Sequence, residues 1–291
     1  MAQRGKQSAT IDSYTRDMAN FLKFTEEFNI NSGDIGLRTL EEFKNWQLDR
    51  GSKHSSIRRS VISVRMFFRW LEESGDLHQN PLDQAPVPAH EYHSARTIDP
   101  EKLRLMIDIA RTGESQLKAS RDVALILLIA HEGLKASEIV SLTWQNFFSA
   151  GEAARLTISG ERARTIGLES ATTEAIRIYR DALKNDNRTR TTLQTSSPLF
   201  MSFKGADART VQHGITRHGL KFAIYELGQA ADIPQLNAEQ LRHFAMAHKL
   251  DLGFTPDMVM AHLGLRRIGN IGKHVQSTLD RPCQKFAEPQ L

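Results

Sequence analysis

The sequence is short of residues that define several protein classes. Its 291 residues contain one cysteine, Cys283, which excludes an internal disulfide and a cysteine-based zinc site. The eleven histidines show no HExxH-type spacing, so we expect no metal ion and no other cofactor. The longest apolar run, Val123 to Ala130, is too short to cross a bilayer.

Neither an export signal nor a strong charge excess marks the chain. Residues 1–6, Met-Ala-Gln-Arg-Gly-Lys, lack the apolar core of a signal peptide, which predicts a cytoplasmic protein without a membrane partner. The 38 Lys and Arg residues barely outnumber the 34 Asp and Glu residues. The net charge of +4 does not by itself indicate a nucleic-acid partner, so the distribution of the charge matters more.

The N-terminal part of the chain has the pattern of a small helical domain. Apolar residues recur at helical spacing in three stretches, around residues 11–22, 40–46 and 57–71. Ser55 or Ser56 is a candidate cap at the start of the third helix.

Proline marks a boundary after this domain. Pro81, Pro86 and Pro88 resist helix formation and indicate an extended segment. A length of 291 residues also suits two domains better than one. We therefore expect a helical domain over residues 1–88 and a linker over 89–97.

The rest of the chain predicts helices with a little β-structure. Asp99 and Pro100 have the residue types of a helix start, and the apolar run 123–130 predicts a buried helix that Gly133 ends. A hairpin is expected around Ser159-Gly160. Its strands are predicted at 156–158 and 165–168. Further helices are predicted at 135–142, 172–183, 218–227 and from Thr255 to Gly264. The predicted fold class is mainly α with a small β-sheet (α+β).

Positive charge is concentrated in a few stretches. The stretch from Arg50 to Arg69 holds no Asp or Glu and contains Arg50, Lys53, Arg58, Arg59, Arg65 and Arg69. The acid-free stretch after His262 adds Arg266, Arg267, Lys273 and His274, and the hairpin adds Arg162 and Arg164. One such cluster is typical of a solvated helix face, whereas three on separate elements favour phosphate binding.

Three motifs resemble those of tyrosine recombinases, the phage integrase and Xer family. Residues 131–144, His-Glu-Gly-Leu-Lys-Ala-Ser-Glu-Ile-Val-Ser-Leu-Thr-Trp, are similar to T-G-L-R-x-S-E-L-x-x-L-x-W. Residues 240–245, Gln-Leu-Arg-His-Phe-Ala, resemble H-x-L-R-H-x-x-A, and 262–265, His-Leu-Gly-Leu, resemble L-G-H. Asn80-Pro81 matches the Asn-Pro that often follows the family's N-terminal domain. The resemblance covers nearly the whole chain.

The resemblance implies a two-domain clamp that grips double-stranded DNA and a location at the nucleoid. It implies a helical core-binding (SAM-like) domain over residues 1–88 and a recombinase-like domain over 98–275. The tail 276–291 is a candidate to dock on another copy of the chain or on a related recombinase.

Family chemistry opens a phosphodiester with a tyrosine, while fixed cations stabilise the negative charge of the transition state. The family's six catalytic residues are, in chain order, an arginine, a lysine, a histidine, a second arginine, a second histidine and the tyrosine. Carried over in that order, their positions fall on Lys135, Ser159, Glu239, Arg242, Leu265 and His274. Only Arg242 is retained unchanged. Arg162 or Arg164 is a candidate substitute for the lysine, and a shifted alignment places the tyrosine position on Gly272.

The chain has four tyrosines, and none follows Tyr225. We therefore predict that it is not an enzyme but a pseudo-enzyme, a double-stranded DNA-binding regulator, architectural factor or inactive recombination partner. Two alternatives stay open. One is an active site-specific recombinase with His274 as an unorthodox nucleophile, and the other is a protein-interaction scaffold that has lost DNA binding. Arg242 itself either contacts a phosphate or is a buried arginine paired with Glu239.

The candidate DNA contacts are the basic residues of these clusters and motifs. They are Lys53, Arg58, Arg59, Arg65, Arg69, Lys135, Arg162, Arg164, Arg242, Arg266, Arg267, Lys273 and His274.

The third helix generates the first testable prediction. Changing Arg58→Glu together with Arg59→Glu should weaken DNA binding across all sequences, because contacts to the phosphate backbone carry no sequence information. The measurement is duplex affinity by gel shift. Unchanged affinity would show that this helix face is merely solvated.

Overall fold

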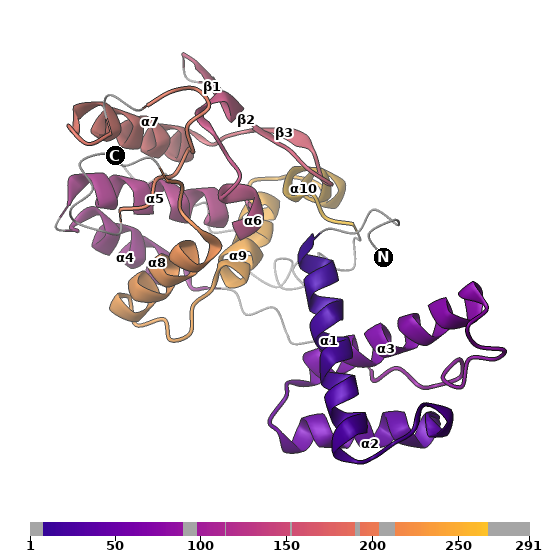
Figure 1. The fold of residues 1–291 in the computed structure, drawn as a ribbon. Coiled ribbons are helices and arrows are strands. Elements are labelled where there is room, and N and C mark those ends of the chain that lie inside the picture. The colour runs from indigo at the N-terminus through magenta and orange to yellow at the C-terminus, as the bar shows by residue number, and fades with distance from the viewer. Residues whose placement is uncertain are drawn as a thin grey trace. The chain divides into compact units, whose positions relative to one another are not determined.

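The computed structural model describes residues 8–89, 98–113, 115–151, 153–189, 193–203 and 213–266 (Figure 1). The chain divides into two compact units, residues 1–93 and 94–291. Helices dominate both units, and a small antiparallel sheet lies in the second. The predicted fold class is therefore confirmed. Among the described residues, no helix is long and apolar enough to cross a membrane.

The first unit consists of α1 (Ser8–Glu27), α2 (Leu37–Asp49) and α3 (His54–Ser74), with a short 3-10 turn η2 (Ser32–Asp34). Aromatic rings fill its core. Phe21 packs edge-on against Phe43, with ring centroids 5.1 Å apart. The three helices predicted from apolar spacing are confirmed, because the apolar stripe of each faces this core.

The predicted cap of the third helix is wrong. Helix α3 begins at His54, with Lys53 at its N-cap position and no side-chain cap. Ser55 and Ser56 lie within the helix, where neither can cap its start.

One buried carboxylate joins α1 to α3. Asp17 is 2% exposed and accepts hydrogen bonds from Arg59 Nε and Nη2 at 3.0 and 2.9 Å. Ser63 Oγ donates a third bond to the same carboxylate at 2.8 Å. A buried charge needs such partners, so Arg59 has a structural role in this unit.

The second unit is built around helix α5 (Gln116–Ala130), whose residues 123–130 are all buried. A helix that is apolar on all sides is stable only when other elements surround it. Here α4 (Pro100–Arg111), α7 (Ser170–Asn185) and α9 (Ala238–Asp251) pack against it. The predicted start of α4 is confirmed, because Asp99 Oδ1 accepts the backbone N–H of Glu101.

The sheet has the order β1-β2-β3, with strands β1 (Phe147–Ala150), β2 (Ala153–Ile158) and β3 (Arg164–Gly167). Every second residue of β2 is buried, and Leu156 pairs with Ile166 across the predicted hairpin, which is confirmed. Strand β1, which follows the 3-10 turn η3 (Trp144–Asn146), was not expected, because four residues are too few to show an alternating pattern.

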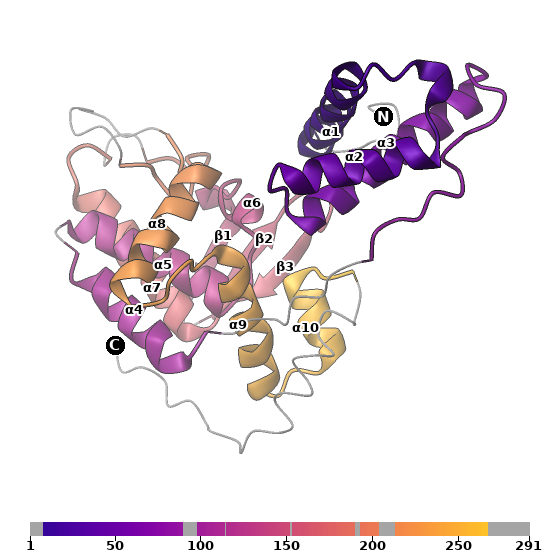
Figure 2. The same cartoon turned by 90° about the horizontal axis from the view of Figure 1, so that it is seen from below.

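The remaining elements are α6 (Ala136–Ile139), α8 (Arg217–Ala230) and α10 (Pro256–Leu263). Helix α6 is shorter than predicted. Helix α10 starts with Thr255 as its cap and ends at Gly264 with φ +64°, as predicted. It lies beside β3 and α9 (Figure 2).

Gly133 turns the chain sharply after α5. Its φ of +68° lies in the left-handed region, which favours glycine. A Cβ at this position would lie 2.5 Å from Leu263 Cγ at the end of α10. The backbone of this turn therefore packs directly on α10.

Loss of the buried ion pair generates a stability prediction. Arg59→Ala should lower the free energy of unfolding by about 2–3 kcal/mol, because Asp17 stays buried without its cation. Urea unfolding of the full chain measures this. The matched control is Arg58→Ala, which removes only the hydrogen bond to Pro88 O and should cost less than about 1 kcal/mol. Equal losses in the two variants would contradict the structural role of Arg59.

The turn at Gly133 generates a second prediction. Gly133→Ala should destabilise the protein by about 2–4 kcal/mol, since a left-handed alanine is strained and its Cβ meets Leu263. Gly253→Ala is the control, because Gly253 also has a positive φ, +88°, but open space around it. It should cost only about 1 kcal/mol. The melting temperatures of both variants test the difference, and similar values would show that contact with Leu263 is unimportant.

Candidate functional site

Arg242, on α9, is a buried arginine held by two backbone carbonyls. Its Nε donates to Gly133 O at 2.7 Å, and its Nη2 donates to Leu263 O at 3.4 Å. The side chain is 5% exposed. The guanidinium is therefore fixed between the turn after α5 and the end of α10.

The third contact of Arg242 is a carboxylate one turn earlier on the same helix. Glu239 Oε2 lies 3.4 Å from Arg242 Nη1, and the Glu239 side chain is 62% exposed. The pairing with Glu239, one of the two alternatives for Arg242, is thus present. Because the Glu239 carboxylate is exposed, another anion from solution can compete with it for Nη1.

Glu138 links the start of α6 to strand β3. Its Oε2 accepts the backbone N–H of Lys135 at 2.8 Å, and its Oε1 accepts Arg164 Nη1 at 2.7 Å. Arg164 Nε also donates to His262 O at 2.7 Å. Burial acts against ionisation of Glu138, but the hydrogen bond from Arg164 and the N–H of Lys135 lower the pKa of its carboxyl group. Glu138 is therefore a carboxylate that fixes the guanidinium of Arg164 and the backbone of Lys135.

Lys135 is the half-buried cation at the centre of this site. Burial lowers the pKa of its ammonium group, and the charges of Arg242 and Arg164 lower it further. Within the described part of the chain Lys135 forms no salt bridge. Neighbouring cations that lower the pKa of Lys135 in this way create a site that stabilises an anion.

The other carried-over positions and basic candidates have different surroundings. Ser159 is exposed at the end of β2, and Leu265 packs on the small apolar cluster of Met246, Val259 and Leu263. Arg266 is exposed and ion-paired with Glu161, whereas Arg162 forms no salt bridge with a described residue. Arg267, Lys273 and His274 lie outside the residues that the structure describes, as does the tail 276–291.

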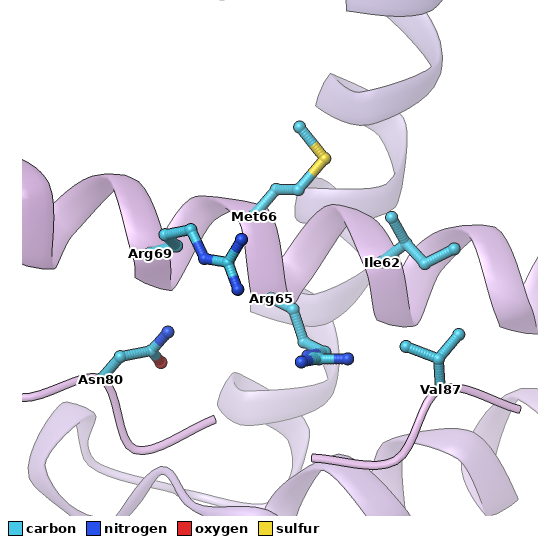
Figure 3. A pocket seen from close by; sticks show the side chains of 6 residues that line it. All are labelled: Ile62, Arg65, Met66, Arg69, Asn80 and Val87. Carbon is cyan, nitrogen blue, oxygen red and sulfur yellow. The ribbon is translucent and has the colours of Figure 1, made fainter. Parts of the chain in front are cut away.

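In the first unit, most candidate DNA contacts of α3 have protein partners. Arg59 is held by Asp17, and Arg58 donates to Pro88 O at 3.0 Å. Arg65 donates to Asp83 O at 2.7 Å, and Arg69 lies 3.6 Å from the Asp83 carboxylate. Figure 3 shows the pocket that these two arginines line with Ile62, Met66, Asn80 and Val87. No Asp or Glu lies within this stretch of the sequence, but the fold brings the carboxylates of Asp17 and Asp83 next to its arginines. Lys53 is exposed.

A buried ionic network lies behind the turn at Gly133, and sequence reasoning missed it. Lys249 Nζ donates to Glu132 Oε2 at 2.8 Å and also contacts Glu169 Oε1. His262 Nε2 lies 3.1 Å from Glu132 Oε2, and His248 Nε2 lies 2.9 Å from Glu169 Oε2. The sequence held one signal for this network, because two polar residues, His131 and Glu132, directly follow a fully apolar run. In the structure both side chains are largely buried.

Comparison with known proteins places this geometry in a family. The model of the N-terminal SAM-like domain of phage integrases matches residues 1–75, and that of the phage integrase family matches 96–278. The tyrosine recombinase XerC of Rhodospirillum centenum is 27% identical over 255 residues, which cover 79% of this chain and 73% of the relative.

These relatives correct one prediction. They are named tyrosine recombinases, XerC or XerD, and such proteins are enzymes. The prediction that this chain is not an enzyme is therefore contradicted. It rested on residue types at single positions, and the relatives match over most of the chain.

Solved structures agree in fold. The XerH site-specific recombinase in a post-cleavage complex with its palindromic difH substrate has a TM-score of 0.74 at 15% identity, covering 94% of this chain and 78% of that one. The lambda integrase dimer bound to a COC' core site has a TM-score of 0.67 at 12% identity, covering 99% and 77%. Together with the family models, which match most of its length, these likenesses show that the chain belongs to the phage integrase family of tyrosine recombinases.

Proposed function

We propose that this chain binds double-stranded DNA and takes part in DNA recombination, with one backbone phosphate held between Lys135 and Arg242. The observation that carries the proposal is the state of Lys135. Its ammonium group is half-buried beside Arg242 and Arg164, and it forms no salt bridge with any residue that the structure describes. Glu138 and Glu239 act on Lys135 only from a distance, and a phosphate oxygen supplies a direct ion-pair partner.

The contacts of Arg242 favour a phosphate approaching from the Glu239 side. Nε and Nη2 are occupied by the carbonyls of Gly133 and Leu263, which leaves Nη1 as the donor that can change partner. Its present partner, Glu239, is exposed and can turn into water when a phosphate takes its place. Arg164 is neutralised by Glu138 and acts mainly by orienting the site.

The first unit would contribute further backbone contacts. Lys53 is exposed, and the hydrogen bond of Arg58 to a carbonyl leaves its charge uncompensated. Arg59 is excluded from this role because Asp17 holds it. We propose domains over residues 1–88 and 98–275 that bind the same duplex, as the complexes of XerH and lambda integrase with DNA suggest for their own chains. Self-association through the tail 276–291 is part of the same proposal.

Duplex affinity across a salt series tests the phosphate site. Lys135→Gln should weaken binding roughly tenfold and reduce the log-log salt slope by about one, as expected for the loss of one phosphate contact. The control is Lys221→Gln, an exposed lysine on α8, which should change neither value. The probe is a duplex selected from genomic fragments by the purified protein. If the chain fails to bind duplex DNA at low salt, or if Lys135→Gln behaves like the control, the proposal is wrong.

The strand chemistry of the family is tested separately. A duplex with a nick near the cleavage site traps a covalent intermediate, which is detected as a protein–DNA adduct that survives denaturation. Because no tyrosine follows Tyr225, the informative variant is His274→Ala. Loss of the adduct in this variant would identify a histidine that attacks phosphorus and forms a phosphoramidate.

A further inference from the structure

Three side chains from separate elements converge at the buried end of α5. They are His131, directly after α5, Glu169, at the N-cap of α7, and His248, on α9. His248 Nε2 lies 2.9 Å and His131 Nδ1 lies 3.4 Å from the same atom, Glu169 Oε2. One ligand atom from each residue lies within 4.8 Å of the other two.

We propose that His131 Nδ1, His248 Nε2 and Glu169 Oε2 bind a divalent transition metal of the Zn²⁺ class. Two imidazoles and one carboxylate are a ligand set that Zn²⁺ accepts, whereas Ca²⁺ and Mg²⁺ prefer oxygen ligands alone. Bonds of about 2.0–2.2 Å in a tetrahedron separate the ligand atoms by about 3.3–3.5 Å. The observed separations from Glu169 Oε2 are close to these values, so small side-chain movements complete the site.

Lys249 leaves Glu169 Oε2 accessible, because its ammonium group contacts Glu169 Oε1 and Glu132 Oε2. His248 Nε2 lies 3.1 Å from Glu169 Oε1 and 2.9 Å from Oε2, and His131 Nδ1 contacts Oε2. Glu169 therefore bridges a lysine on one oxygen and a metal ion on the other. Glu132 holds Lys249 in place through its Oε2. Its other oxygen, Oε1, accepts a hydrogen bond from the backbone N–H of Glu169.

The charge of the buried cluster favours an added cation. Glu132 and Glu169 carry two negative charges against one positive charge on Lys249, so the cluster has a net charge of −1 when its histidines are neutral. Glu132 is fully buried, so a net charge on the cluster that contains it is costly. A metal ion supplies the compensation. The competing source is a proton on His248 or His262, which the experiment below distinguishes.

The chemical state of His131 suits a ligand. Among the described residues its Nδ1 is a buried ring nitrogen without a hydrogen-bond partner, because the contact with Glu169 is long. Burial, and then the neighbouring His248, lower the pKa of His131 to about 4, so the ring is neutral at physiological pH. The side chains of His131 and Glu169 are 12% and 24% exposed, which leaves solvent access for an ion and a water ligand.

A bound ion would act on the site next to it. It would join α5, α7 and α9, and α5 and α9 also carry the turn at Gly133 and the side chain of Arg242. The role assigned to it is to fix these helices relative to one another, and it takes no part in the chemistry of the phosphate.

The proposal is tested by calorimetric titration of the full, untagged and EDTA-treated chain with Zn²⁺. One ion per chain should bind with a micromolar or tighter dissociation constant, and saturation should raise the melting temperature by several degrees. His131→Ala should weaken binding by roughly 100-fold. The matched control, His218→Ala, removes an exposed histidine on α8 and should bind like the parent chain.

Co²⁺ provides a second measurement that does not depend on a variant. The parent chain should give the intense visible absorption of four-coordinate Co²⁺, and added Zn²⁺ should abolish it. Absence of stoichiometric Zn²⁺ binding at about 100 µM overturns the proposal and leaves a histidine proton as the counter-charge. Equal affinity in His131→Ala and His218→Ala overturns it as well, since the ion would then bind elsewhere.

Discussion

The second unit depends on one buried ammonium group. Lys249 Nζ lies between the carboxylates of Glu132 and Glu169, and its side chain is 2% exposed. These residues belong to α9, to the end of α5 and to the start of α7, so one charge fixes three helices. Removing the ammonium would leave the two carboxylates without the cation that joins them, and Glu132 is fully buried. The turn at Gly133 and the guanidinium of Arg242 take their positions from the elements that this contact joins.

Much of the fold follows from local patterns in the sequence. Apolar spacing predicts α1, α2 and α3, and the apolar run 123–130 predicts a helix surrounded on all sides, because a helix can bury only the faces that its sequence makes apolar. The ends of α10 follow from Thr255 and Gly264 for equally local reasons. Strand β1 could not be predicted, since its pairing partner β2 and not its own sequence makes it a strand.

The site is less predictable because its partners are far apart in the chain. Motif resemblance brings attention to Lys135 and Arg242, but Asp17 reaches Arg59 across 42 residues and Lys249 reaches Glu132 across 117. A count of the basic residues along a helix therefore overstates how many of them are free to bind DNA. The same limit explains why histidine spacing did not reveal that His131, Glu169 and His248 lie together. It also applies to activity, since residue types at single motif positions led to a prediction that the enzyme relatives contradict.

The exposed carboxylate of Glu239 gives the proposed phosphate site a built-in competitor. It is tethered one helical turn from Arg242, so its local concentration near Nη1 far exceeds that of any free anion in solution. Inorganic phosphate or a mononucleotide would compete with Glu239 through a single phosphate contact. A duplex meets it with many contacts at once, and the combined contacts make displacement of one solvated side chain a minor cost. The proposed site would therefore favour a long polyanion over a small anion through the number of contacts and not through shape.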